Sequence, residues 1–113
     1  MRRQAYGCGL EAALAVIGGK WKPIVLWYLT PGPRRFGELR RLVTSISEKM
    51  LIQPLREMEA DGIVARKDFR EIPPRVEYLL TPFGVSLSDA LRPLCDWGKE
   101  QMSRIGKAKA EAG

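Results

Sequence analysis

Apolar residues recur at helical spacing near the start of the chain. Leu10, Ala13, Leu14 and Ile17 follow the i, i+3, i+4, i+7 pattern, which predicts a first helix over about residues 9–18, closed by glycine. Residues 21–29 are apolar nearly all round. A helix of that kind has no face suited to water, so we expect it in the middle of the core.

Two further helices with a tight turn between them are predicted over about residues 36–62. Ser47 is a suitable N-cap for the second of these helices, while Ser45 with Glu48 forms a rival capping box. Gly62 is expected to end that helix. Its predicted buried stripe consists of Met50, Leu51, Leu55 and Met58.

Two strands and a last helix follow. Residues 64–69 and 75–80 are typical of strands, and Pro73-Pro74 belong at the tip of the hairpin because proline cannot donate to a ladder. Thr81 is expected to cap a helix that starts at Pro82 and is kinked at Pro93. The expected apolar face of this helix consists of Leu87, Ala90, Leu91, Leu94, Trp97, Met102 and Ile105.

This order of elements predicts an α+β fold that is mainly α. It is the layout of a winged helix-turn-helix with a two-stranded β-wing and a long C-terminal helix. A chain of 113 residues suits one domain. We therefore expect a single domain over residues 1–113, with the helix-turn-helix at about 36–62 and the wing at about 64–80.

Charge is unevenly distributed along the chain. The net charge is +6, and residues 34–75 carry ten basic and seven acidic side chains, whereas residues 76–113 carry five of each. A basic balance over the predicted helix-turn-helix and wing favours an anionic partner such as double-stranded DNA.

Several functional classes lack their signatures. The sequence has no histidine, no Cys-x-x-Cys pair and no glycine-rich phosphate loop, so we expect no metal site, no cofactor and no enzymatic activity. No apolar run is long enough to span a bilayer, and no hydrophobic signal core follows Met1-Arg2-Arg3-Gln4. We expect a cytoplasmic protein with no membrane partner.

Major-groove reading needs a helix whose outer face carries hydrogen-bonding side chains. Lys49, Gln53 and Arg56 are spaced to share one such face. Glutamine can pair with adenine and arginine with guanine through two hydrogen bonds each. Ser45 and Ser47 of the preceding turn are expected to meet the same groove. The alternative is a solvated face that contacts nothing.

Basic side chains flank this helix on both sides. Arg34-Arg35 and Arg40-Arg41 border the third helix, where we expect Arg34, Arg35 and Arg40 to bind phosphates. Arg41 pairing with Glu38 is an alternative. The wing carries Arg66, Lys67, Arg70 and Arg75, of which the last three are expected to contact DNA. Asp68 and Glu71 between them are positioned to neutralise these charges instead.

Each of the two cysteines has two interpretations. Cys8 comes just before the first helix and near Arg2 and Arg3, a setting that favours the reactive thiolate of a redox sensor. The alternative is a small buried hydrophobe. Cys95 lies on the apolar face of the last helix, where packing is expected. The aromatic residues Trp21, Trp27, Tyr28 and Trp97 suit the core or a ligand pocket between subunits.

Five ordered motifs resemble one known family. They are Cys8-Gly9-Leu10-Glu11 with Ile17-Gly18-Gly19-Lys20-Trp21-Lys22, Arg35-Phe36-Gly37-Glu38-Leu39-Arg40, Ile46-Ser47-Glu48-Lys49-Met50-Leu51, and Pro73-Pro74-Arg75-Val76-Glu77-Tyr78. Together they are similar to the HxlR-type winged helix-turn-helix transcription regulators, bacterial relatives of the MarR group. The resemblance covers roughly Cys8 to Trp97.

The resemblance implies a homodimer on a pseudo-palindromic operator, with dimerisation helices at about 9–18 and 82–105. The implied interface residues are Leu10, Leu14, Leu87, Leu91, Leu94, Trp97 and Met102. It also implies a redox-sensing role for Cys8, switched by an oxidant or electrophile. The chain departs from the family at Pro54, which is expected to bend the recognition helix at Met50, and at Gly9, where a proline often stands.

Two other functions fit the same residues. One is a regulator that responds to a small ligand, such as an aromatic compound, with no redox role for Cys8. The other is a winged-helix module that binds protein. DNA binding is distinguished from protein binding by a steep loss of affinity as salt rises.

Overall fold

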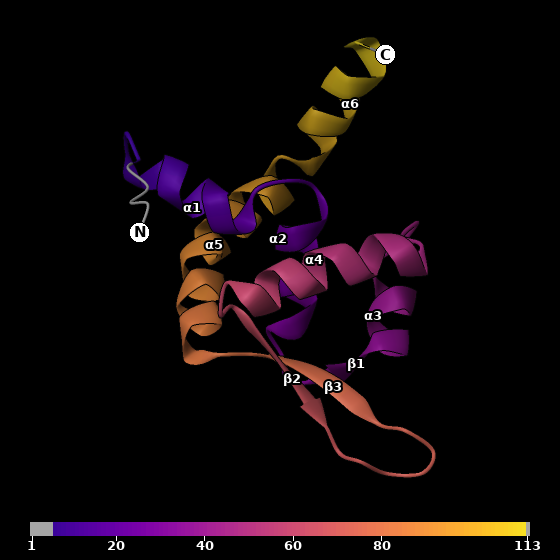
Figure 1. Ribbon diagram of the computed structural model, residues 1–113. Coiled ribbons are helices and arrows are strands. Elements are labelled where there is room, and N and C mark those ends of the chain that lie inside the picture. Colours follow the sequence, from indigo (N-terminus) through magenta and orange to yellow (C-terminus); the bar gives the residue numbers. More distant parts are fainter. Residues whose placement is uncertain (1–5, 113) are drawn as a thin grey trace.

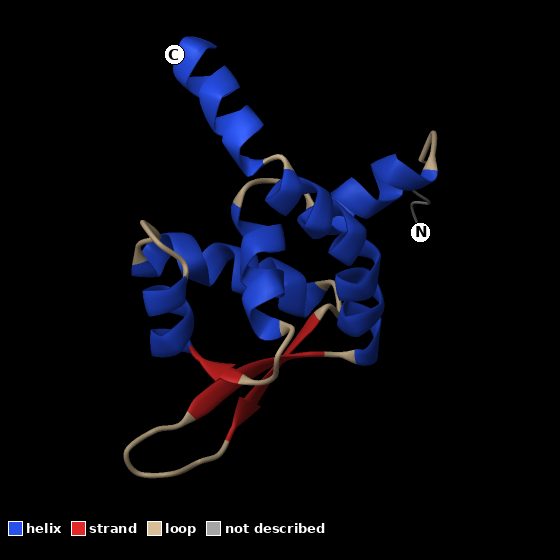
Figure 2. Cartoon of the chain, turned by 180° about the vertical axis from the view of Figure 1, so that it is seen from behind, coloured by secondary structure: helices blue, strands red, loops and turns tan. Residues whose placement is uncertain are grey.

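The computed structural model describes residues 6–112 of the chain (Figure 1). In this part the elements are, in order, α1 (Gly9–Ile17), α2 (Trp21–Leu29), β1 (Arg34–Arg35), α3 (Phe36–Leu42), α4 (Glu48–Ala60), β2 (Val64–Asp68), β3 (Val76–Leu80), α5 (Pro82–Glu100) and α6 (Met102–Ala112). The strands gather at one edge of a helical body, and α6 projects from the opposite side (Figure 2). The fold is a mainly helical winged helix-turn-helix, as predicted.

The core forms around α2, because this helix is apolar on nearly all sides. Val25, Leu26 and Leu29 of α2 are fully buried. They belong to one cluster with buried residues of α3, α4 and β2, which are Leu39, Leu51, Leu55, Met58 and Val64. The predicted central position of residues 21–29 is confirmed, although Trp27 remains 42% exposed.

The wing belongs to a three-stranded antiparallel sheet in the order β1-β3-β2. Arg34 pairs with Tyr78 and Arg35 with Glu77, while Val64 of β2 pairs with Leu80 on the other side of β3. The wing hairpin itself has two strands, β2 and β3, as predicted, and β1 is a third strand that was not expected. A strand of two residues has no alternation of apolar and polar positions, so a sequence pattern cannot reveal it.

Thr81 connects the wing to α5 as a cap. Its hydroxyl accepts the backbone N–H of Gly84 at 3.0 Å and lies 3.2 Å from the carbonyl oxygen of Ile63. Pro82 occupies the first turn of α5, where a missing N–H costs nothing. The predicted start of the last helix is thus confirmed, and the cap fixes α5 against the end of the sheet.

The C-terminal helix is not continuous over residues 82–105. It passes through Pro93, ends at Glu100 and restarts at Met102, with Gln101 at φ −100° and ψ 9°. The interruption therefore lies eight residues beyond the proline expected to kink the helix, and α6 extends to Ala112. Within residues 6–112, no helix combines the length and apolar character that crossing a membrane requires.

Candidate nucleic-acid interface

Helix α4 presents the predicted reading face to solvent. Lys49, Gln53 and Arg56 are exposed on one side of the helix. Ser47 is the N-cap, because its hydroxyl accepts the N–H of Met50 at 3.2 Å. Ser45 has a φ of +69° and stands in the turn, so the rival capping box with Glu48 does not form. Both serines are exposed beside the first turn of α4.

The buried stripe of α4 differs from the prediction at one position. Leu51, Pro54, Leu55 and Met58 are buried and follow the i, i+3, i+4, i+7 spacing of one helix face. Met50 lies one residue off this stripe and is 41% exposed, so its assignment to the core is wrong. Pro54 is buried on this stripe, and α4 continues through it from Glu48 to Ala60.

A groove lies along each side of α4. The first, of about 430 Å³, separates α4 from α3 and the wing, and Arg56 and Arg66 line it together with Tyr78. The second, of about 320 Å³, separates α4 from the connection between α1 and α2 and is lined by Gly18–Lys22 and Gln53. The two grooves bring residues from outside the helix-turn-helix to the edges of the reading face.

The arginines at the two ends of α3 divide into two kinds. Arg34 is partly buried on β1; its Nε donates to the carbonyl oxygen of Tyr28, and its guanidinium lies 4.0 Å from the carboxylate of Glu38. Arg35, Arg40 and Arg41 are exposed. Glu38 also accepts the backbone N–H of Arg35, so its carboxylate serves the start of α3 and is not paired with Arg41. Arg34 therefore has a structural role within the fold.

The basic residues of the wing also differ in their surroundings. Arg75 forms ion pairs with Glu71 at 3.5 Å and Glu77 at 3.1 Å, and its guanidinium stacks 3.9 Å from the ring centre of Phe69. Glu71 thus neutralises Arg75, as one of the alternatives predicted. Arg70 is exposed, with a φ of +53°, and only its backbone N–H is held, by Asp68.

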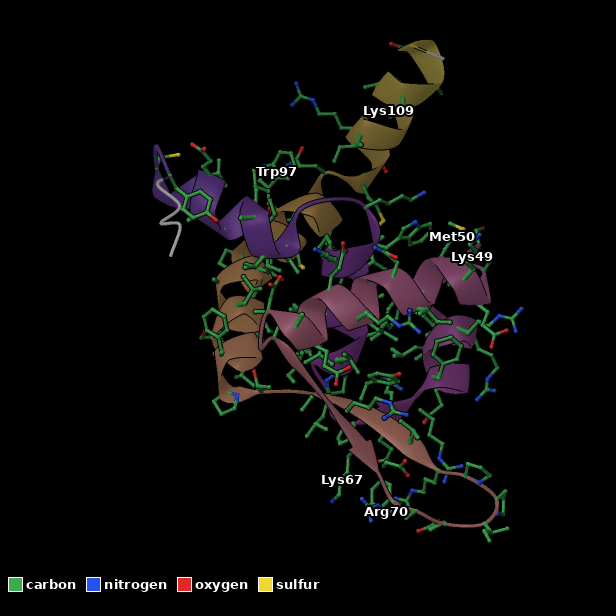
Figure 3. The ribbon with its side chains drawn as sticks, in the orientation of Figure 1. Lys49, Met50, Lys67, Arg70, Trp97 and Lys109 are labelled. Carbon is green, nitrogen blue, oxygen red and sulfur yellow. The ribbon has the colours of Figure 1, made fainter. Side chains whose placement is uncertain are left out.

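Lys67 is exposed with its ammonium 4.7 Å from the centre of the Phe69 ring. Figure 3 shows Lys67 and Arg70 on the wing, at the end of the molecule opposite Lys109 of α6. Lys49 lies at the first turn of α4. The exposed cations of the wing therefore lie at the end of the molecule away from α6 (Figure 3).

Apolar side chains remain exposed on the helices away from the wing. Leu10 and Leu14 of α1 are 68% and 54% exposed, and Leu94, Trp97 and Met102 are 62%, 56% and 67% exposed. Two of the residues expected at an interface behave differently: Leu87 and Leu91 are partly buried and pack against the core. Exposed apolar side chains are common at protein interfaces.

Cys8 is exposed at the N-cap position of α1. Its carbonyl oxygen accepts the N–H of Ala12, and Glu11 accepts the N–H of Gly7. The buried alternative for Cys8 is thus wrong, while Arg2 and Arg3, the basic neighbours expected from the sequence, lie outside the described residues. Cys95 is half-buried in an apolar pocket of about 550 Å³ between α2, α5 and α6, where Trp27 and Tyr28 also lie.

Sequence reasoning missed the residues that line the two grooves from outside α4. Arg66 of the wing lies beside Arg56 in the first groove, and Gly18–Lys22 lines the second, and the sequence pattern indicated neither position. Lys20 and Lys22 were the only residues of that segment whose charge could have indicated a contact with DNA. Nothing in the spacing of the sequence indicates that they lie along α4.

A helix-turn-helix followed by an antiparallel wing defines a winged helix-turn-helix regulator. The chain belongs to the HxlR-like helix-turn-helix family, whose profile matches residues 16–106. It is 52% identical over 93 residues to the HTH-type transcriptional regulator YkvN of Bacillus subtilis (strain 168), covering 82% of this chain and 79% of YkvN. The protein is accordingly a transcriptional regulator of the HxlR type, in a family of DNA-binding regulators and not of enzymes.

Two solved structures are also similar to this one. The redox regulator HypR in its reduced form is 42% identical with a TM-score of 0.82, covering 88% of this chain and 99% of HypR. The reduced form of the transcriptional regulator YodB from B. subtilis is 32% identical with a TM-score of 0.72, covering 84% of this chain and 94% of YodB.

Proposed function

We propose that this regulator binds a pseudo-palindromic operator as a homodimer, with α4 of each protomer in the major groove of one half-site. The observation that carries the proposal is the exposed face of Lys49, Gln53 and Arg56 on a helix whose opposite face is buried in the core. A rigidly packed helix holds such side chains in a fixed arrangement for reading base edges.

The proposed contacts fall into two groups. Gln53 and Arg56 meet base edges, and Ser45, Ser47 and Lys49 lie at the start of the same helix, where side chains enter the groove. Arg35 at the start of α3, Arg40 in its last turn, and Lys67 and Arg70 on the wing bind phosphates, which set affinity and register without reading sequence. Arg34 and Arg75 contribute less than the sequence suggested, because carboxylates of the protein already neutralise them.

The exposed apolar side chains of α1, α5 and α6 supply the proposed dimer interface. Leu10, Leu14, Leu94, Trp97 and Met102 lie on helices at the end of the molecule away from the wing. A second copy of the chain related by a two-fold axis would bury these residues and present two α4 helices to DNA. Two-fold symmetry of the protein then matches two-fold symmetry of the operator.

Modification of Cys8 is the proposed switch. Cys8 is exposed at the first turn of α1, and α1 carries two of the proposed interface residues, Leu10 and Leu14. A change in the thiol would shift α1 against the partner and alter the spacing of the two α4 helices. Similarity to HypR, a redox regulator with oxidised and reduced structures, and to YodB, which has a diamide-treated structure, supports this proposal.

Fluorescence anisotropy on labelled duplexes that tile the upstream region of the protein's own gene tests the DNA-binding proposal. We expect tight binding to one duplex, weakening steeply as salt rises because phosphate contacts release counterions. Gln53→Ala should reduce the preference for that duplex, with Lys109→Gln on α6 as the control. Equal, salt-insensitive binding to every duplex would support a protein-interaction module instead.

A second candidate is regulation by a small aromatic ligand without a redox role. The apolar pocket between α2 and α5, lined by Trp27, Tyr28, Cys95 and Met102, is the observation that favours it. This candidate predicts that Cys8→Ala leaves regulation unchanged and that an aromatic compound raises the melting temperature of the protein. The redox proposal predicts instead that Cys8→Ala abolishes the response of the regulator.

A further inference from the structure

The groove on the side of α4 away from the wing is lined by Lys20 and Lys22, which have no role in the DNA interface proposed above. The segment Gly18–Lys22, which consists of the α1–α2 connection and the first two residues of α2, forms one wall of this groove, and Gln53 lies on the other. Figure 1 shows the α1–α2 connection along one side of α4 and the sheet along the other. Gln53 is thus shared between the reading face and this groove.

The dimensions of DNA assign a role to both sides of α4. The major groove of B-DNA is about 12 Å wide, and a helix with its side chains is about 10–12 Å across. A helix seated in the major groove therefore has a phosphate backbone on each side. The wing, with Lys67 and Arg70, meets one backbone. The segment Gly18–Lys22 is the part of this protein that faces the other.

The charges in this segment suit a phosphate. Lys22 is mostly buried, and its ammonium lies 3.3 Å from the carboxylate of Glu57, which is 46% exposed. The acidic side chain that lines this groove is therefore neutralised by Lys22. Lys20 is exposed, and its ammonium lies 4.6 Å from the centre of the Trp21 ring. Within residues 6–112 no carboxylate pairs with Lys20. One cation of the groove therefore remains available to an anion.

We infer that Lys20 binds the DNA phosphate backbone on the side of α4 away from the wing, so that each protomer holds both strands bordering its half-site. This inference rests on the proposed function, because it takes α4 to occupy the major groove. A lysine ammonium is a point charge that binds phosphate oxygens without reading bases. Its contribution is therefore independent of sequence and sensitive to salt.

The test measures binding to a labelled mixed-sequence duplex over a series of salt concentrations for the wild type, Lys20→Gln, Lys20→Arg and Lys109→Gln. Log affinity falls with log salt, and each lost phosphate contact makes this slope less steep by about 0.9. A dimer of Lys20→Gln lacks two such contacts, so its slope should be less steep by about 1.8. Over a fourfold rise in salt, the wild type then loses about twelvefold more affinity than this variant. Lys20→Arg and Lys109→Gln should keep the wild-type slope.

A wild-type slope in Lys20→Gln, with a lowered slope in Arg70→Gln, would overturn this inference and leave the proposed function intact. The absence of salt-dependent DNA binding in the wild-type protein would overturn both. Thermal unfolding followed by circular dichroism checks that Lys20→Gln and Lys109→Gln are equally folded, as expected for two exposed side chains. If Lys20→Gln is destabilised, Lys20→Met also removes the charge, and its salt slope is compared with that of the wild type instead.

Discussion

The hydroxyl oxygens of Thr30 and Ser88 lie 3.0 Å apart, although 58 positions separate the two residues in the sequence. Thr30 follows the end of α2, and its single hydroxyl hydrogen also points toward the carbonyl oxygen of Leu26 at 3.3 Å. When Thr30 donates to Leu26, Ser88 is the donor to Thr30. Ser88 is only 2% exposed, so this hydrogen bond fixes α5 against the central helix inside the protein.

Ser88→Ala should lower the free energy of unfolding by about 1 kcal/mol, because it removes the partner of a sheltered hydroxyl. For a domain of this size the expected loss in melting temperature is about 4 °C at a fixed protein concentration. Ser103→Ala, at an exposed position of α6, is the control and should change little. Equal melting temperatures of the two variants would contradict the role assigned to Ser88.

Gly84→Ala should be among the most destabilising single substitutions in α5. A Cβ atom at Gly84 would lie 2.1 Å from the carbonyl oxygen of Ile63, a backbone atom that cannot rotate away. We expect a loss of about 2–4 kcal/mol in the free energy of unfolding, which denaturant titration measures. Gly106→Ala in α6 meets no atom within 4 Å and should be neutral or stabilising, which makes it a matched control.

Hydrophobic periodicity was sufficient to predict most of the fold. Residues 21–29 form the central helix, Thr81 caps α5, and the wing strands end within one residue of their predicted limits. Two features of the fold had no such signal. Strand β1 has two residues and exists only because β3 pairs with it, and the break at Gln101 follows neither a proline nor a glycine.

The candidate site could be predicted less completely than the fold. The exposed face of α4 followed from spacing, since Lys49, Gln53 and Arg56 share one side of a helix. The roles of Arg34 and Arg75 did not, because ion pairs with nearby carboxylates depend on how a strand or loop places them. The position of Lys20 beside α4 depends on the packing of the α1–α2 connection, which no local pattern encodes.

The two wing arginines should differ in their contribution to DNA binding. Arg70→Gln is expected to lower the slope of log affinity against log salt by about 0.9 for each protomer, because an exposed arginine binds a phosphate. Arg75→Gln should lower it less, since Glu71 and Glu77 already pair with that guanidinium. Anisotropy titrations at several salt concentrations measure both slopes. If the slope changed more in Arg75→Gln than in Arg70→Gln, Arg75 and not Arg70 would be the main phosphate contact of the wing.

Leu94→Glu should weaken the proposed dimer. Leu94 is 62% exposed on α5, so the substitution has little effect on the isolated chain but places a charge in the proposed interface. Light scattering after gel filtration should give a mass near the 12.7 kDa of one chain for this variant and twice that value for the wild type. Ile72→Glu, at a fully exposed position between β2 and β3, is the matched control and should remain dimeric. A monomeric wild-type protein would exclude the dimer.

Oxidation of Cys8 should reduce operator affinity. Diamide takes two electrons and two protons from two thiols, here Cys8 and free cysteine added to the assay, and the two sulfur atoms join in a disulfide. The attached group would stand at the first turn of α1, beside Leu10 and Leu14 of the proposed interface. We expect a loss of about 5–150-fold in affinity, the usual range of coupling between two sites, with recovery on reduction by dithiothreitol. Anisotropy on the operator duplex measures this loss.

Two cysteine variants separate this switch from general damage by the oxidant. Cys8→Ser should bind the operator normally and ignore diamide, because its hydroxyl cannot form a disulfide. Cys95→Ser should respond like the wild type, since the half-buried Cys95 thiol lies in an apolar pocket away from the exposed first turn of α1. If Cys95→Ser ignores diamide while Cys8→Ser responds, the sensing thiol is the one in the pocket. If all three proteins bind equally before and after treatment, the regulator has no thiol switch and the ligand-responsive candidate is favoured.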